Sequence, residues 1–205
     1  MIVRPSIRDV TFIAANMRPR DWEEISCQLP AHYTPLAAAL MCWEMTPDDC
    51  MFVAKTRAGE PAAFFGWTPS LHPSLWSAWA FGTDQMARVI PLVSNFIVVD
   101  QFPEIVRRHN PTRFEARALS THTHALRWLS MIGARQECVL PAYGKNGEDF
   151  VMFGWTQRSI WTTREKWVSR VSRATRYDRS HTPDVHTQSP QSAEATPRTR
   201  AAVAA

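Results

Sequence analysis

Cysteine is scarce in this sequence and never closely paired, which excludes two classes of small domain. The 205 residues include four cysteines, Cys27, Cys42, Cys50 and Cys138, and no CxxC motif. Disulfide-rich secreted domains need a dense set of cysteines and zinc ribbons need CxxC pairs, so the chain fits neither class. We expect four free, buried thiols and a protein made in a reducing cytosol.

Long apolar runs are missing as well. No stretch reaches about 18 consecutive apolar residues, the length that a membrane-spanning helix needs, and the first residues, MIVRPSIRD, lack the apolar segment of a signal peptide. We therefore expect no membrane span and no leader, and we find no internal repeat. A hydrophobic share of 45% over this length predicts one globular domain with an appendage.

Charge is unevenly distributed along the chain. Residues 157–205 contain nine Lys or Arg against four Asp or Glu, which leaves 14 basic and 15 acidic residues in 1–156. The formal net charge of +4 is thus carried by the C-terminal segment. Such a segment can contact nucleic acid or an acidic protein surface, or it can be a solvated extension.

Hydrophobic periodicity and turn residues predict alternating groups of helices and strands in residues 1–156. Ser6 and Thr34 are expected to cap the helices that follow them, and Pro91 and Pro103 to bend a long helix over 84–108. The expected helices are 6–17, 18–28, 34–45, 84–108 and one that ends at Gly133, and the expected strands are 2–3, 50–56, 61–70, 75–81, 113–119, 135–142 and 149–156.

The C-terminal segment divides into two parts. Residues 157–177 predict a basic amphipathic helix, and residues 178–205 are rich in Ser, Thr, Pro and Ala, which predicts an arm that is flexible or ordered by a partner. The apolar face of the helix is a candidate partner surface, and packing of this face on the chain's own sheet is the alternative. The residues that we expect to bind a partner are Trp161, Arg164, Trp167, Val168, Arg170 and Val171.

The order of these elements resembles the α+β fold of the GNAT superfamily of N-acetyltransferases, a mixed central sheet flanked by helices, over 1–156. The segment THALRWLSMIGARQE is similar to the penultimate helix of that family, with Ala125 near its start and Gly133-Ala134 at its end. The opening segment IVRPSIRDVTFIAANMRPRDWEEI is similar to acetyltransferase-like virion proteins of short-tailed bacteriophages. The resemblance implies a particle protein in the virion, and in the host cytoplasm during assembly.

Two positions depart from the pattern of active members of the family. The resemblance implies an Arg/Gln-x-x-Gly-x-Gly/Ala loop that binds the pyrophosphate of coenzyme A, but WAFGTDQMARVI supplies only Gly82 and adds Asp84. A Tyr that serves many members as general acid is replaced by Leu129, which has no proton to donate. We therefore expect no catalytic residue, no cofactor-binding residue and no bound acetyl-CoA.

The histidines give a weak metal signal. His122 and His124 lie two residues apart without an Asp, Glu or Cys beside them, so we expect a helix-entry or contact role and no metal site. Residues 107–111, RRHNP, predict a solvated helix end.

Three functions follow from these observations, in order of preference. The first is a non-catalytic GNAT-like virion protein, at the head–tail junction, in the tail or packaged in the head. Such a protein would be present in multiple copies and would contact other virion proteins. Contact with DNA is a further option. The second is an active N-acetyltransferase that uses acetyl-CoA. The third is a nucleic-acid-binding module acting through the basic C-terminal segment.

Overall fold

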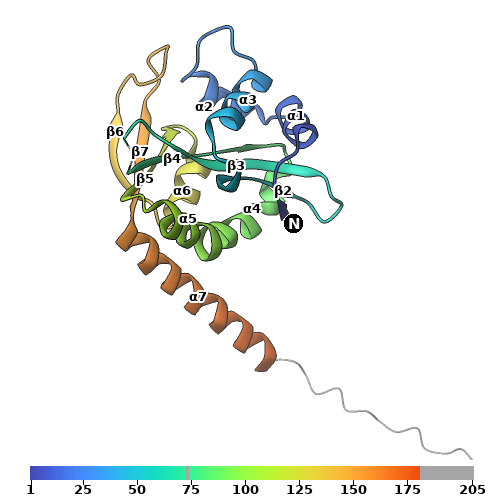
Figure 1. Cartoon of the computed structure of the whole chain (residues 1–205), viewed down its shortest axis with the longest axis vertical. Helices are drawn as coiled ribbons and strands as arrows, with labels where there is room; N and C mark the ends of the chain where they lie inside the picture. The colour runs from blue at the N-terminus through green and yellow to red at the C-terminus, as the bar shows by residue number, and fades with distance from the viewer. Residues whose placement is uncertain (73, 181–205) are drawn as a thin grey trace, which may run out of the picture.

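The computed structural model describes residues 1–72 and 74–180. Residues 181–205, most of the arm expected over 178–205, lie outside the described residues. The body is a seven-stranded sheet with helices on both faces (Figure 1). The predicted α+β class is therefore confirmed.

The sheet has the order β1-β2-β3-β4-β5-β7-β6. The strands are β1 (Ile2–Val3), β2 (Met51–Lys55), β3 (Pro61–Pro69), β4 (Leu75–Gly82), β5 (Arg113–Leu119), β6 (Arg135–Leu140) and β7 (Phe150–Thr156). Neighbouring strands are antiparallel except β4 and β5, which run parallel. The single parallel pair separates an N-terminal meander from a C-terminal group of strands.

The helices form a layer on each face of the sheet (Figure 1). They are α1 (Ile7–Ala15), α2 (Pro19–Ser26), α3 (Pro35–Met45), the 3-10 helix η1 (Asp48–Cys50), α4 (Met86–Asn95), the π-helical segment η2 (Phe96–Gln101), α5 (Phe102–His109), α6 (Thr123–Met131) and α7 (Gln157–Ser180). Because side chains alternate along a strand, Phe64 packs with α1 and α3 on one face and Phe65 packs with α4 and η2 on the other. The sheet thus separates two apolar cores.

The core on the Phe65 face of the sheet is covered by one nearly continuous helix, made of α4, η2 and α5. Met86–His109 is the only helix among the described residues that is long and apolar enough to cross a membrane. Its apolar face, however, packs on the sheet. That face includes Val89, Val93, Ile97, Phe102 and Ile105. We expected one α-helix bent at its prolines; instead Pro91 lies inside α4, and a π-helical segment precedes Pro103.

The last helix, α7, follows β7 directly and docks beneath α5 and η2. Ile160 is buried against the core, and Trp167 donates its indole N–H to Asn95 Oδ1 at 3.2 Å. Pro103 has no N–H to donate to the carbonyl of Val99, four residues earlier, and Arg164 Nε donates to that carbonyl at 3.3 Å. The first half of α7 is therefore held to the body, while its second half projects away (Figure 1).

Candidate functional site

The sheet opens between β4 and β5. These strands pair over only three residues each, ending at Ser77 and Glu115. Each stays paired with its outer neighbour to its end, β4 with β3 as far as Gly82 and β5 with β7 as far as Leu119. The two strands therefore diverge beyond Ser77. The side chains that follow on both strands include the small residues Ala78, Ala80, Ala116 and Ala118.

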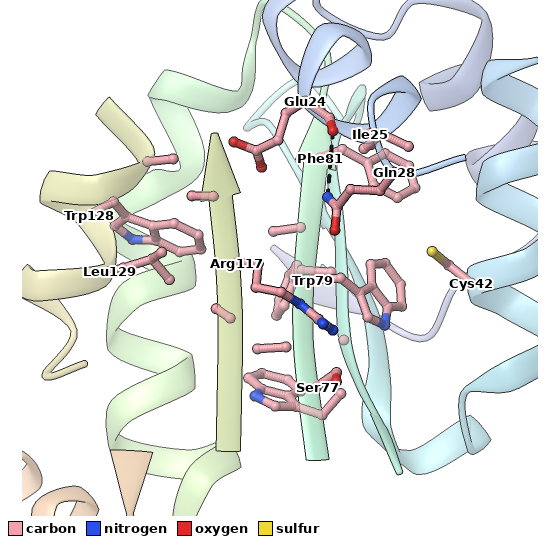
Figure 2. Close-up of a pocket in the computed structure, with 18 of the residues that line it drawn as sticks. Glu24, Ile25, Gln28, Cys42, Ser77, Trp79, Phe81, Arg117, Trp128 and Leu129 are labelled. Carbon is pink, nitrogen blue, oxygen red and sulfur yellow. Dashed lines mark hydrogen bonds between the residues drawn. The ribbon is translucent and has the colours of Figure 1, made fainter. Parts of the chain in front are cut away.

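A cavity of about 250 Å³ occupies this gap (Figure 2). Its lining is mainly apolar, and the side chains of Glu24, Gln28, Ser77 and Arg117 add polar groups. Other lining residues are Ile25, Met41, Cys42, Trp67, Trp79, Phe81, Ile97, Phe102, Trp128, Leu129 and Trp155. The cavity is thus bordered by α2 and α3 on one face of the sheet and by η2, α5 and α6 on the other.

The wall of the cavity contains an unpaired donor. Trp67 is 2% exposed, and its Nε1 has no hydrogen-bond partner within the described residues. Buried N–H groups are nearly always bonded because leaving one unpaired costs about 1–3 kcal/mol. A ligand with a carbonyl or similar acceptor would satisfy this donor.

Glu24 lies at one end of the cavity, where its carboxylate contacts two groups of the same chain. Its Oε2 accepts the backbone N–H of Leu119 at 2.9 Å and lies 2.9 Å from His122 Nδ1. His122 is buried at the start of α6, as expected for a helix-entry role, whereas His124 is exposed. The two histidines therefore share no site, and α2 is tied to the end of β5 instead.

The turn after β4 is the place where the family resemblance puts a pyrophosphate. Here four of its N–H groups are already bonded within the chain. Gly82 N–H donates to the carboxylate of Asp21 at 2.8 Å, and Thr83 N–H donates to Ala62 O at 2.9 Å. Met86 N–H donates to Thr83 O at 2.9 Å, and Gln85 N–H donates to Thr83 Oγ1 at 3.2 Å. These four donors are not available to a ligand.

Asp21 is the central residue of this turn, although the sequence indicated only a helix-dipole role for it. Its side chain is 4% exposed and accepts two hydrogen bonds from Arg18, at 3.0 Å from Nε and 2.7 Å from Nη2. Gly82 serves close packing, since a Cβ there would lie 2.3 Å from Ala62 O. Asp84, which we expected to repel the cofactor, is exposed to solvent. The bonded N–H groups and the buried carboxylate of Asp21 make this turn poorly suited to a pyrophosphate.

The α6 side of the cavity is lined by aliphatic and aromatic side chains. Leu129, at the position of the family's tyrosine, is 7% exposed and contributes only apolar surface. Burial raises the pKa of the Cys42 thiol to about 12, so this thiol stays protonated at neutral pH and is a poor nucleophile. All four cysteines are free. The expectation of burial is confirmed for Cys27 and Cys50, but Cys42 is only partly buried and Cys138 is exposed on the edge strand β6.

The predicted partner residues on α7 divide into two groups. Arg164 and Trp167 each donate one hydrogen bond within the chain, to Val99 of η2 and to Asn95 of α4. Trp161, Val168 and Val171 are 42%, 41% and 49% exposed. Arg170 is exposed as well. The structure thus leaves the second group at the surface.

The predicted solvated end of the long helix is also seen. Arg107 and Arg108 both pair with Glu104 one turn earlier. Asn110 ends α5 with a left-handed φ of 47°. These cations therefore have partners within the helix.

No family model matches this chain, and no curated protein matches its sequence. Solved structures do match it in fold. Spermidine N-acetyltransferase from Vibrio cholerae, in complex with CoA and spermine, is similar with a TM-score of 0.59 at 10% identity, over 78% of this chain and 97% of that one. Ribosomal-protein-alanine N-acetyltransferase from Brucella melitensis gives a TM-score of 0.58 at 11% identity, over 76% and 99%. A GNAT-family acetyltransferase from Bacillus anthracis gives 0.53 at 10% identity, over 77% and 94%. The chain has the fold of GNAT-family acetyltransferases.

Proposed function

We propose that the chain uses the GNAT fold as a non-catalytic structural protein of a short-tailed bacteriophage particle. The observation that carries the non-catalytic part is the hydrogen bond from Gly82 N–H to the buried carboxylate of Asp21. The chain's own anion thus lies where a cofactor's pyrophosphate would need the same donor. Arg18 compensates the charge of Asp21, so the cost to a cofactor lies in the donor itself. A pyrophosphate would have to displace the carboxylate from the Gly82 N–H, and a buried polar group left without its hydrogen bond costs about 1–3 kcal/mol.

The virion part of the proposal is supported by the opening segment, residues 2–25, and by the exposed surface of α7. Trp161 and Val168 present apolar surface on the same helix as the cations Arg158, Lys166 and Arg170. A helix of this kind suits docking to an acidic surface of another virion protein in a repeated assembly, and its charge also suits DNA contact. The proposed location is the virion, and the host cytoplasm while particles are being assembled.

Calorimetric titration with acetyl-CoA tests the non-catalytic part. We expect no heat of binding for the wild type at cofactor concentrations up to the millimolar range. Asp21→Asn removes the buried charge, whereas Asp84→Asn, the matched control, removes an exposed one from the same turn. We expect any gain in affinity only in Asp21→Asn, since only that carboxylate bonds the Gly82 N–H. Micromolar binding by the wild type would sink the proposal.

Purified particles test the virion part. We expect mass spectrometry to find the chain in virions of the phage that encodes it, and Trp161→Ser to abolish incorporation while the body keeps its melting temperature. Trp167→Ser is the informative control, because Trp167 packs on the body and its loss should lower the melting temperature. If the Trp161→Ser chain is incorporated normally, the exposed surface of α7 is not the surface that contacts other virion proteins.

An active N-acetyltransferase is the second candidate. The cavity between β4 and β5 and the unpaired indole N–H of Trp67 favour it, because both suit a ligand with an amide or acyl group. Acetyl-CoA turnover with amine and peptide acceptors, together with the titration above, distinguishes this candidate from the first.

A further inference from the structure

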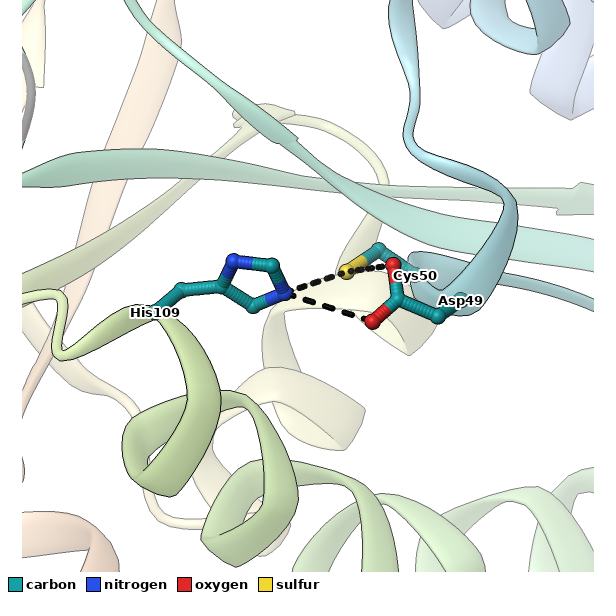
Figure 3. Close-up of side chains that lie close together, drawn as sticks. All are labelled: Asp49, Cys50 and His109. Carbon is teal, nitrogen blue, oxygen red and sulfur yellow. Dashed lines mark hydrogen bonds and ion pairs between the residues drawn. The ribbon is translucent and has the colours of Figure 1, made fainter.

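Three side chains with different metal-binding atoms meet between η1 and the end of α5. Asp49 and Cys50 belong to η1, and His109 is the last residue of α5. His109 Nε2 lies 3.3 Å from Asp49 Oδ2 and 3.8 Å from Cys50 Sγ (Figure 3). Cys50 Sγ lies 3.5 Å from Asp49 Oδ1. All three donors lie within 4.8 Å of one another, which no other trio of His, Cys, Asp or Glu does among the side chains described, in residues 1–72 and 74–172.

These separations agree with the edges of a tetrahedral metal site. Zinc bonds of about 2.3 Å to sulfur and about 2.1 Å to nitrogen and oxygen place donor atoms roughly 3.4–3.6 Å apart. Asp49 presents one carboxylate oxygen to each of the other two donors, so a small rotation of the carboxylate suffices. We propose that Asp49, Cys50 and His109 bind a borderline-soft divalent cation of the zinc class, with solvent at the fourth position.

The surroundings hold the donors in place and leave one path of entry. The Trp76 ring packs on the His109 ring with centroids 4.9 Å apart, and Gln101 Nε2 donates to the backbone carbonyl of Asp49 at 3.3 Å. Cys50 is fully buried, which leaves it too enclosed to attack a substrate. The side chains of Asp49 and His109 are 30% and 31% exposed, so the cation enters from their side.

One cation already competes for the site. Arg108 Nη1 lies 3.2 Å from Asp49 Oδ2, and Arg108 also pairs with Glu104 on α5. Arg108 therefore keeps a partner when Asp49 turns to the metal. Binding forms a bond from Cys50 Sγ to the cation and releases the thiol proton to solvent, so the charge of the cation is partly compensated.

Cobalt(II) titration of the full chain, stripped of metal beforehand, tests the site. A thiolate bound to cobalt gives a ligand-to-metal charge-transfer band, and zinc should displace it at one equivalent. We expect Cys50→Ser to abolish the band. His109→Gln should weaken binding by more than about 100-fold, since loss of even an outer partner costs 10–100-fold. Cys138→Ser removes the exposed thiol on β6 and is the matched control, with no change expected.

Two further measurements keep the outcome decisive. Arg108→Gln removes the competing cation without touching a donor and should tighten binding several-fold. Zinc at 100 times its Kd should raise the melting temperature of the wild type by roughly 5–10 °C and leave that of His109→Gln unchanged. If the wild type gives no thiolate band with millimolar cobalt, or if Cys138→Ser loses it, the three side chains are only bonded to one another and the proposal is wrong.

Discussion

The carboxylate of Asp21 is the group whose removal tests the structure most directly. Asp21→Ala deletes two hydrogen bonds from Arg18 and leaves the Gly82 N–H without its acceptor. An unpaired buried N–H costs about 1–3 kcal/mol, and breaking a buried ion pair costs about 3–5 kcal/mol. Arg18 is 27% exposed and can turn partly to water, so we expect a total near 3 kcal/mol. Urea unfolding measures this loss as a lower midpoint at constant slope.

The same helix provides the control for this experiment. Glu23 pairs with Arg20, and both side chains are largely exposed, at 51% and 41%. Glu23→Ala should therefore cost less than about 0.5 kcal/mol. A double-mutant cycle of Arg18→Ala with Asp21→Ala should give a coupling of about 1–3 kcal/mol. If Asp21→Ala costs no more than Glu23→Ala, the carboxylate does not hold the turn, and our account of the closed pyrophosphate site fails.

Two further predictions concern the C-terminal half. Gly133→Ala should cost about 1–3 kcal/mol more than Gly147→Ala by urea unfolding, because both glycines have φ near 90° but only the Cβ at 133 would meet Thr163 of α7, at 2.2 Å; equal losses would mean that α7 does not dock there. The hydrogen bonds from Arg113 hold the pKa of Glu137 below its usual 4.5, despite partial burial. This pair stabilises the folded state above pH 4.5 and the contribution is lost as pH falls through the lowered pKa, so Glu137→Gln should flatten the stability profile below pH 4.5, and an unchanged profile would contradict the pairing.

The parts of the fold that depend on local chemistry could be predicted from the sequence. Ser6 accepts the N–H of Asp9 and Thr34 accepts the N–H of Ala37, so both caps begin helices where their side chains indicated. The alternation of Phe114, Ala116 and Ala118 with charged residues likewise identified β5, because alternation follows from the geometry of a strand. The other strands were indicated by short apolar runs bounded by turn residues.

The parts that depend on contacts distant in sequence could not be predicted. Asp21 and Gly82 lie 61 residues apart, and nothing near either residue indicates that they meet. His109 and Cys50 are separated by 59 residues, and RRHNP read alone indicates only a helix end. An acid in the first turn of a helix has an adequate local explanation in the helix dipole, which concealed the tertiary role of Asp21.

The π-helical segment also fixes the helical phase of everything after it. Val89, Val93, Ile97, Gln101 and Ile105 are all buried at intervals of four residues. In a plain α-helix, ~100° per residue would place Ile105 about 160° around the axis from Val89. The wider turn of η2 absorbs the excess and returns Ile105 to the sheet. If one residue were deleted within Phe96–Gln101, a regular α-helix would place Ile105 only about 60° around the axis from Val89. This segment should therefore tolerate a single-residue deletion that α4 and α5 on either side would not.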